Sequence, residues 1–109
     1  MFIRYELYID DEAQDVGIFQ GISELDLDDD TSDAYLDAFD NVLTIPFDVF
    51  VKWRTQSWFT EKGEKRFLED INRIVALYNN SGLFEVRRIV KETLDDIVYS
   101  DEYQVLTKM

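Results

Sequence analysis

Carboxylates are the side chains of this sequence that could do chemistry, and they are concentrated in residues 24–40, ELDLDDDTSDAYLDAFD. This acidic segment carries eight carboxylates and no positive charge. We consider three interpretations: a metal-binding loop, a surface that imitates the phosphates of nucleic acid, and the hydrated side of an ordinary helix. The candidate partner-binding residues are Glu24, Asp26, Asp28, Asp29, Asp30, Asp33, Asp37 and Asp40.

A calcium loop of the EF-hand type needs acids at positions 1, 3 and 5, glycine at position 6 and a bidentate glutamate at position 12. A loop that starts at Asp26 meets the first requirement with Asp28 and Asp30. Its sixth residue is Thr31, which lacks the conformational freedom of glycine. Its twelfth residue is Asp37, whose side chain is one methylene shorter than glutamate. The pattern therefore argues against a dedicated calcium site. We expect the protein to bind neither a metal nor a cofactor.

Imitation of nucleic acid is the interpretation with a biological consequence. Duplex DNA carries one negative charge per ~1.7 Å of its axis, and carboxylates three or four residues apart on a helix lie about 6 Å from one another. Asp33, Asp37 and Asp40 would form such a row. The protein would then bind a basic or nucleic-acid-binding protein and inhibit it by occupying its basic cleft. The alternative is a structural or housekeeping domain whose acidic face only keeps it dissolved.

The net charge of −13 comes entirely from the first half of the chain. Residues 1–51 hold 14 acids and one base, Arg4, whereas residues 52–109 hold ten of each. Such a field repels phosphate backbones and anionic lipids, so we expect no direct binding of nucleic acid or of membranes. No apolar run approaches the roughly 20 residues that span a bilayer, and the sequence has no cysteine. A cytoplasmic protein is the simplest expectation.

An enzyme is not expected from this composition. Histidine, the most common general base, is absent. Cysteine is also absent, so there is no thiol nucleophile. The serines therefore have no imidazole to activate them. An enzyme that uses carboxylates alone is a further alternative, since pairs such as Asp95 and Asp96 have the residue type of glycosidase acids. Adjacent side chains point apart, however, which argues against that pair.

Hydrophobic periodicity predicts a helix over residues 33–43 that carries part of the acidic segment. Leu36, Phe39 and Leu43 share one face of this helix, opposite the row of aspartates. Thr31 or Ser32 is the predicted N-cap. Other helices are predicted over residues 17–25 and 61–82, and strands over residues 2–9, 47–60 (one or two), 83–91 and 97–106 (a hairpin).

This order of elements predicts an α+β fold. We expect a single domain over residues 1–109, built on a mainly antiparallel sheet of about four to five strands with two to three helices packed on one face. The helix over residues 61–82 has the strongest pattern, with Thr60 as its N-cap and Gly82 as its C-terminal stop. Its inward stripe is Phe67, Leu68, Ile71, Ile74, Val75 and Tyr78.

Aromatic and basic residues in the second half have structural interpretations. Trp53, Trp58 and Phe59 are expected to pack in the core or sheet, and a binding hot spot is the alternative. Arg87, Arg88 and Lys91 are the only basic cluster. The preferred interpretation is that they protect an edge strand from aggregation, and the alternative is that they pair with the acidic half of the chain. They could also meet the acidic helix of a second copy in a homo-oligomer.

The stretches WFTEKGEKRF and IVYSDEYQV resemble segments of small uncharacterised bacterial and phage-encoded proteins. In those proteins an aromatic strand leads into a helix, and the chain closes on an IVY-x-D-x-x-QV hairpin. The resemblance covers residues 53–109 and implies no activity and no functional residues. Separately, the charge and size are similar to those of phage inhibitors that imitate DNA, which is a similarity of composition.

Overall fold

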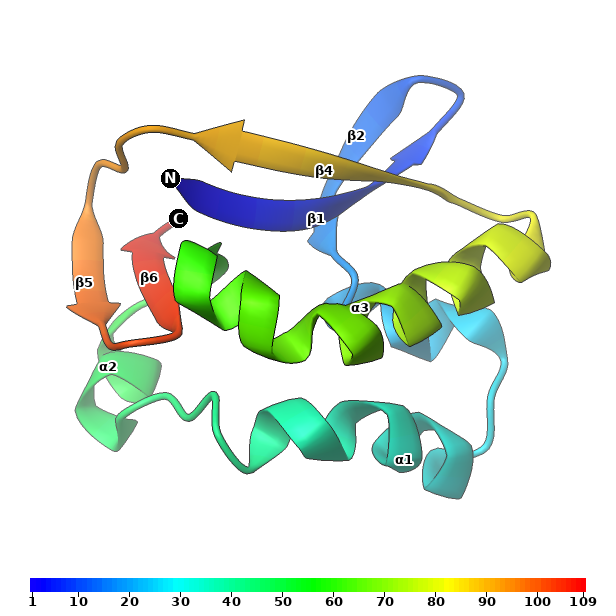
Figure 1. Cartoon of the computed structure of the whole chain (residues 1–109), viewed down its shortest axis with the longest axis horizontal. Helices are drawn as coiled ribbons and strands as arrows, with labels where there is room; N and C mark the ends of the chain where they lie inside the picture. The colour runs from blue at the N-terminus through cyan, green and yellow to red at the C-terminus, as the bar shows by residue number, and fades with distance from the viewer.

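An antiparallel sheet of six strands forms the framework of the protein, and helices pack against it (Figure 1). The computed structural model describes residues 1–109, of which 41% are helical and 33% lie in strands, so the predicted α+β class is confirmed. The strand order is β2-β1-β3-β6-β5, and β4 pairs with the other edge of β1. The strands are β1 (Phe2–Ile9), β2 (Glu12–Gly17), β3 (Thr55–Thr60), β4 (Glu85–Lys91), β5 (Ile97–Ser100) and β6 (Gln104–Lys108).

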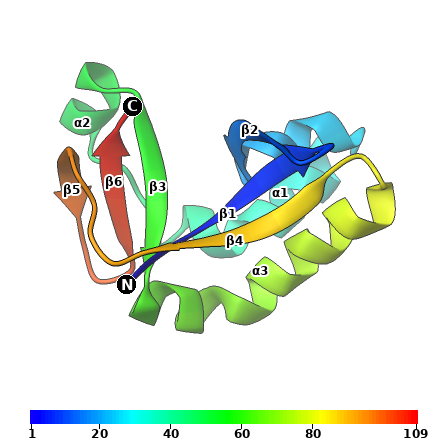
Figure 2. The same cartoon turned by 90° about the horizontal axis from the view of Figure 1, so that it is seen from above.

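The sheet is sharply bent, because two strands, β3 and β2, pair with different parts of the same edge of β1. β1 pairs with β4 from Phe2 to Tyr8, but it meets β3 only at Phe2 and Ile3 and then pairs with β2. Figure 2 shows β3, β6 and β5 turning steeply away from β1 and β4. β2 and β3 therefore follow one another along this edge of β1 without pairing with each other.

The strand β2 was not expected, and it raises the strand count above the predicted four to five. Its hairpin with β1 is closed by Asp10 and Asp11, which both have positive φ (50° and 65°), between the paired residues Ile9 and Glu12. Two left-handed residues are the mark of a type I′ turn, which usually contains Asn-Gly or Asp-Gly. The Asp-Asp sequence thus concealed the turn, and no strand was predicted between residues 9 and 17.

The helices form a second layer that is two helices deep. Figure 1 shows α3 between the sheet and α1, and α3 packs against β1, β3, β4 and α1. No helix is long and apolar enough to cross a membrane. The helices are the 3-10 helix η1 (Gln20–Leu25), α1 (Asp29–Asp40), α2 (Phe47–Lys52) and α3 (Glu61–Ser81).

The helix α3 begins and ends where its caps predicted. Thr60 accepts a hydrogen bond from the Gly63 amide at 3.0 Å, and Gly82 ends the helix with a φ of 70°. The prediction that Leu68 belongs to the inward stripe is wrong, since this residue is 45% exposed. A Cβ on Gly63 would collide with the backbone carbonyl of Tyr103, because the first turn of α3 lies directly on the β5–β6 turn.

A single core lies between the sheet, α3 and α1. Tyr78 is fully buried, and its hydroxyl donates to the Ile18 carbonyl at 2.5 Å, which ties α3 to the segment after β2. Phe39 is the one fully buried residue of α1, and its ring lies 5.1 Å from that of Phe67. The core consists of Ile3, Leu7, Ile18, Phe39, Phe59, Phe67, Ile71, Ile74 and Tyr78.

Candidate functional site

The acidic segment folds as the end of η1, a short loop and the helix α1. The helix begins at Asp29, four residues before the predicted start, because Asp28 is the N-cap instead of Thr31 or Ser32. The Asp28 Oδ1 accepts a hydrogen bond from the Thr31 amide at 2.7 Å, and this bond lowers the pKa of the Asp28 carboxyl. Asp28 therefore has a structural role in addition to its charge.

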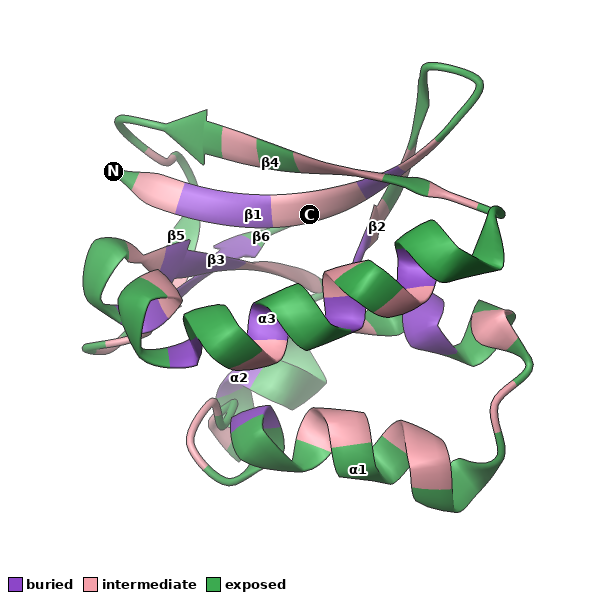
Figure 3. Cartoon of the chain, turned by 45° about the vertical axis from the view of Figure 1, so that its right-hand side comes forward, coloured by how far each residue is buried: buried purple, intermediate pink, exposed green.

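Five aspartates of α1 occupy one side of the helix. At 3.6 residues per turn, each residue advances by about 100°, which places all five within a sector of about 100°. The inward residues Phe39 and Tyr35 lie on another side, and Figure 3 shows the exposed outer surface of α1. The aspartates of this sector are Asp29, Asp30, Asp33, Asp37 and Asp40.

All eight carboxylates of the acidic segment are exposed, and none forms an ion pair with a lysine or arginine. Basic residues elsewhere are engaged: Arg88 pairs with Glu64, and Arg87 pairs with Asp11 and Glu85. Pairing of the basic cluster with the acidic half is observed only between Arg87 and Asp11, which lies outside the acidic segment, and Lys91 forms no ion pair. The strand β4 that carries the cluster pairs with β1 alone, so the cluster lies on an edge strand. The negative charge of the segment is left for solvent or for a partner.

The charge of α1 is unfavourable for the helix itself. Asp37 and Asp40 stand in its last turns, where no basic residue is present and where the helix dipole disfavours negative charge. Asp33 is also four residues from both Asp29 and Asp37, and like charges at this spacing repel. Only Asp28, Asp29 and Asp30 lie where the dipole favours an acid. Helix stability alone therefore does not explain the row of aspartates.

The acids of the segment are not arranged as a metal site. No group of three or more acidic side chains in the protein lies close enough to hold an ion together. Asp26 has a left-handed backbone (φ 53°) that ends η1, and Asp28 is turned toward the amide that it caps. The oxygens of the candidate calcium loop are therefore not gathered around a common point.

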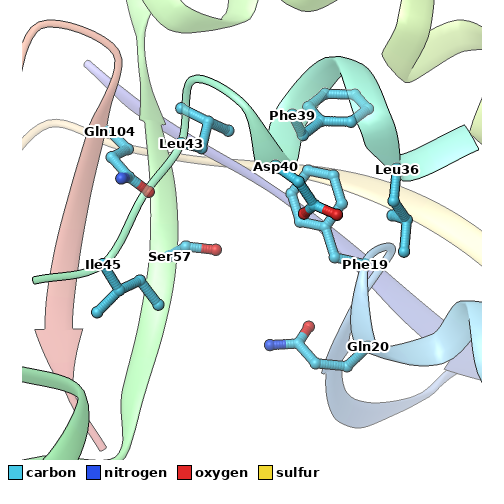
Figure 4. Close-up of a pocket in the computed structure, with 9 residues that line it drawn as sticks. All are labelled: Phe19, Gln20, Leu36, Phe39, Asp40, Leu43, Ile45, Ser57 and Gln104. Carbon is cyan, nitrogen blue, oxygen red and sulfur yellow. The ribbon is translucent and has the colours of Figure 1, made fainter. Parts of the chain in front are cut away.

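A pocket of about 260 Å³ opens beside the acidic sector, between α1, η1 and β3. Its apolar wall includes Phe19 and Phe39, whose ring centroids are 4.8 Å apart. Asp40 is its one charged residue, and no lysine or arginine lines it. Figure 4 shows the nine lining residues: Phe19, Gln20, Leu36, Phe39, Asp40, Leu43, Ile45, Ser57 and Gln104.

The polar groups of this pocket have unused hydrogen-bonding capacity. Gln104 is 3% exposed, and its amide nitrogen donates to the Thr44 carbonyl at 2.8 Å, but its side-chain oxygen has no protein donor. The Ser57 hydroxyl, the Gln20 amide and the Asp40 carboxylate also form no hydrogen bond within the protein. In Figure 4 these last three groups lie around the same open space. Apolar walls with a few convergent polar groups are typical of binding sites.

The pocket residues Gln104, Ser57 and Gln20 were missed by the sequence analysis. Gln104 alternates with the buried Leu106 along β6, so a polar residue at an inward strand position was the available signal. Ser57 and Gln20 gave no comparable signal, because they lie far apart in the sequence and line the same pocket only in the folded protein. Trp58 and Phe59 are buried in β3, as predicted for core or sheet packing. Trp53 instead follows α2 as its C-cap and is only half-buried.

A second apolar surface lies on residues 47–52, next to the pocket residue Ile45. These residues were predicted to be part of a strand, and that prediction is wrong. Residues 47–52 form the helix α2, not a strand, and the Phe50 amide donates to the Pro46 carbonyl at 2.9 Å. The side chains of Phe47 and Phe50 are 78% and 68% exposed. Ile45, which lines the pocket, is also exposed, so apolar surface continues from the pocket onto α2.

Arg4, the only base of the first half, is a buried residue of β1 whose side chain reaches β3. Its side chain is 4% exposed; Nε donates to Glu6 at 3.1 Å and Nη1 donates to the Ser57 carbonyl at 3.0 Å. Burial lowers the pKa of Arg4, while the nearby Glu6 and Asp15 oppose that shift. The residue therefore supports the bend of the sheet and leaves the acidic segment uncompensated.

Comparison of the chain with protein-family models, with curated proteins and with solved structures gives no match.

Proposed function

We propose that the protein is an acidic protein-binding domain that presents residues 24–40 to a basic partner. The observation that carries this proposal is that all eight carboxylates of the segment are exposed and unpaired. A cation supplied by a partner would relieve the mutual repulsion of the aspartates on α1. The role is one of binding without catalysis, and the partner is a protein because phosphate backbones would be repelled.

The sharper form of the proposal is that the segment imitates nucleic acid and inhibits its partner. Five aspartates on one side of α1 offer a row of charges about 6 Å apart, and Glu24, Asp26 and Asp28 extend it beyond the helix. Such a row would fit a cleft that normally receives a charged backbone. Electrostatic steering would make the association fast and strongly dependent on salt.

Affinity capture with a charge-matched control tests the proposal. The test variant is D30N/D33N/D37N, which removes three carboxylates of the segment without altering the pocket. The control is E69Q/E92Q/D95N, which removes three exposed and unpaired carboxylates elsewhere. The captured partner should be retained by the wild type and the control, lost by the test variant, and displaced by added duplex DNA.

Two outcomes would contradict the proposal in different ways. Equal loss of capture in both triple variants would mean that overall charge alone matters, which is the behaviour of a merely solubilising face. Loss in the test variant without displacement by duplex DNA would leave a basic partner but remove the imitation of nucleic acid.

A further inference from the structure

We propose that the pocket between α1, η1 and β3 receives the side chain of one arginine or lysine of the basic partner. This inference rests on the proposed function and specifies the chemistry of the contact. The cationic head would lie at Asp40, beside Ser57 and Gln20, and the aliphatic stem would lie on Phe19 and Leu36.

The size of the pocket fits one long side chain. At about 260 Å³ it is smaller than the roughly 300 to 1,000 Å³ of sites that enclose drug-sized ligands or cofactors. It is open on the same side as the exposed α2 surface, since Ile45 belongs to both. A residue that projects from a partner's surface could therefore enter while its backbone stays outside.

The polar lining favours a cationic group that donates hydrogen bonds. One N–H of the Gln104 side-chain amide donates to the Thr44 carbonyl, and the side-chain oxygen receives no hydrogen bond within the protein. The Asp40 carboxylate is also an acceptor, and the Ser57 hydroxyl and the Gln20 amide can accept as well. Arginine and lysine are the side chains with several donors and no acceptor. An anion would instead meet the charge of Asp40, with no basic residue in the lining to offset it.

The apolar lining suits the rest of the same side chain. Arginine and lysine bury their methylene stems on apolar surface while the charged head reaches a polar partner. Phe19 lines the pocket and is only partly buried, and a cation over an aromatic ring face is attracted to it. The protein already makes such contacts elsewhere, as in Arg73 over the Tyr35 ring of α1 at 5.3 Å.

Titration with N-acetyl-arginine amide, followed by NMR of the ¹⁵N-labelled protein, tests the inference directly. Saturable shifts are expected at the Gln104 side-chain amide and at the backbone amides of Ser57 and Gln20. N-acetyl-citrulline amide has nearly the same shape without the charge, and it should produce no saturable shift at these positions. Equal responses to both probes, or no saturable shift with the arginine probe, would overturn the inference.

Three variants separate this inference from the proposed function. D40N should weaken binding of the arginine probe about tenfold, because a charged hydrogen-bond partner is lost. S57L should abolish binding by filling the pocket, and D40N keeps the test valid if S57L fails to fold. D30N/D33N/D37N should retain the pocket shifts while losing the partner.

The outcomes of this set are distinct. If the arginine probe does not bind but D30N/D33N/D37N still loses the partner, the pocket inference falls and the proposed function stands. If the probe binds and D40N abolishes its shifts while the triple variant keeps the partner, the pocket is a cation site and the proposed function falls. Probe binding that is unchanged by both D40N and S57L would place the cation elsewhere and overturn the inference.

Discussion

The acidic segment and the layer formed by α3 and β4 use carboxylates in opposite ways. On α3, Glu64 accepts two hydrogen bonds from Arg88, both at 2.7 Å, and a third from the Tyr5 hydroxyl at 2.5 Å. On α1 no aspartate has a basic partner. The chain therefore has enough basic residues to pair acids where they stabilise the fold, and it leaves the acidic segment unpaired.

This difference is also visible in how the two regions are packed. The helix α3 buries Phe67, Ile71, Ile74 and Tyr78, whereas α1 buries only Phe39. Burial fixes a helix through apolar contacts of about 25 cal/mol per Å², so α3 is held much more firmly than α1. One region is thus built for stability, and the other is available for contact. Changes in the two regions should accordingly have effects of opposite sign on stability.

The largest effect on stability is expected from G63A, because Gly63 on α3 lies against the backbone of Tyr103. The new methyl group would meet the Tyr103 carbonyl, which is backbone and cannot rotate away. We expect a loss of about 2 kcal/mol or more in the free energy of unfolding, beyond any gain in helix propensity. G17A is the control, because its methyl group would meet the movable ends of Gln20 and Arg4. Urea denaturation of both variants checks this, and equal losses would contradict it.

A smaller loss of stability is expected from E64Q. This variant removes the carboxylate on α3 that pairs with Arg88 on β4. The hydrogen bonds from Arg88, assisted by that of Tyr5, lower the pKa of Glu64, although partial burial opposes them. Its stabilisation is therefore complete above the ordinary glutamate pKa of about 4.3 and is lost as the pH falls through the lowered folded value. E64Q should cost about 1 to 2 kcal/mol at pH 7.

The pH dependence provides the check on E64Q. Below about pH 4.3 the difference between wild type and E64Q should shrink. E69Q, on the same helix but exposed and unpaired, is the matched control, and it should leave stability nearly unchanged. Thermal melts across pH 2 to 7 measure both. A constant difference between wild type and E64Q at all pH values would mean that packing, and not charge, is lost.

The smallest effect on stability is expected from D33N/D37N on α1, and it is a gain instead of a loss. This double variant removes like-charge neighbours that each destabilise the helix by about 0.2 to 0.5 kcal/mol. Asp37 also stands near the end of the helix where the dipole disfavours it. Stability should therefore rise by up to about 1 kcal/mol at low salt, and added salt should narrow the difference.

The control for this double variant is E69Q/D95N, which changes the net charge equally. If both variants gain the same stability, overall charge repulsion is the cause, and α1 is not a special region. If D33N/D37N loses stability, some aspartate of α1 has a structural role that its exposed position does not reveal.

The parts of the fold that could be predicted are those in which local signals agree with the tertiary structure. The helix α3 has a long apolar stripe, the cap Thr60 and the stop Gly82, and all three act locally. β1 has apolar residues at alternating positions, of which Ile3 and Leu7 are fully buried. Both elements were therefore placed almost to the residue.

The parts that could not be predicted depend on unusual turns or on distant contacts. Residues 47–52 have valine and phenylalanine at alternating positions and read as a strand, yet they form α2 directly after Pro46. The start of α1 was misplaced because several consecutive acids could act as its cap. In the pocket, Gln20, Ser57 and Gln104 come from three separate elements, so no local pattern joins them.

The position of β1 has a consequence for how the protein forms. This strand pairs with β2 near in sequence, but its longest pairing is with β4, about 85 residues further along the chain. During synthesis only the β1–β2 hairpin can close early, and the opposite edge of β1 stays open until nearly the whole chain has emerged. Ile3 and Leu7 are fully buried in the folded protein, and throughout that interval the elements that cover them have not yet been completed. A nascent chain of this protein would therefore be most prone to aggregation at its first strand, well after that strand has left the ribosome.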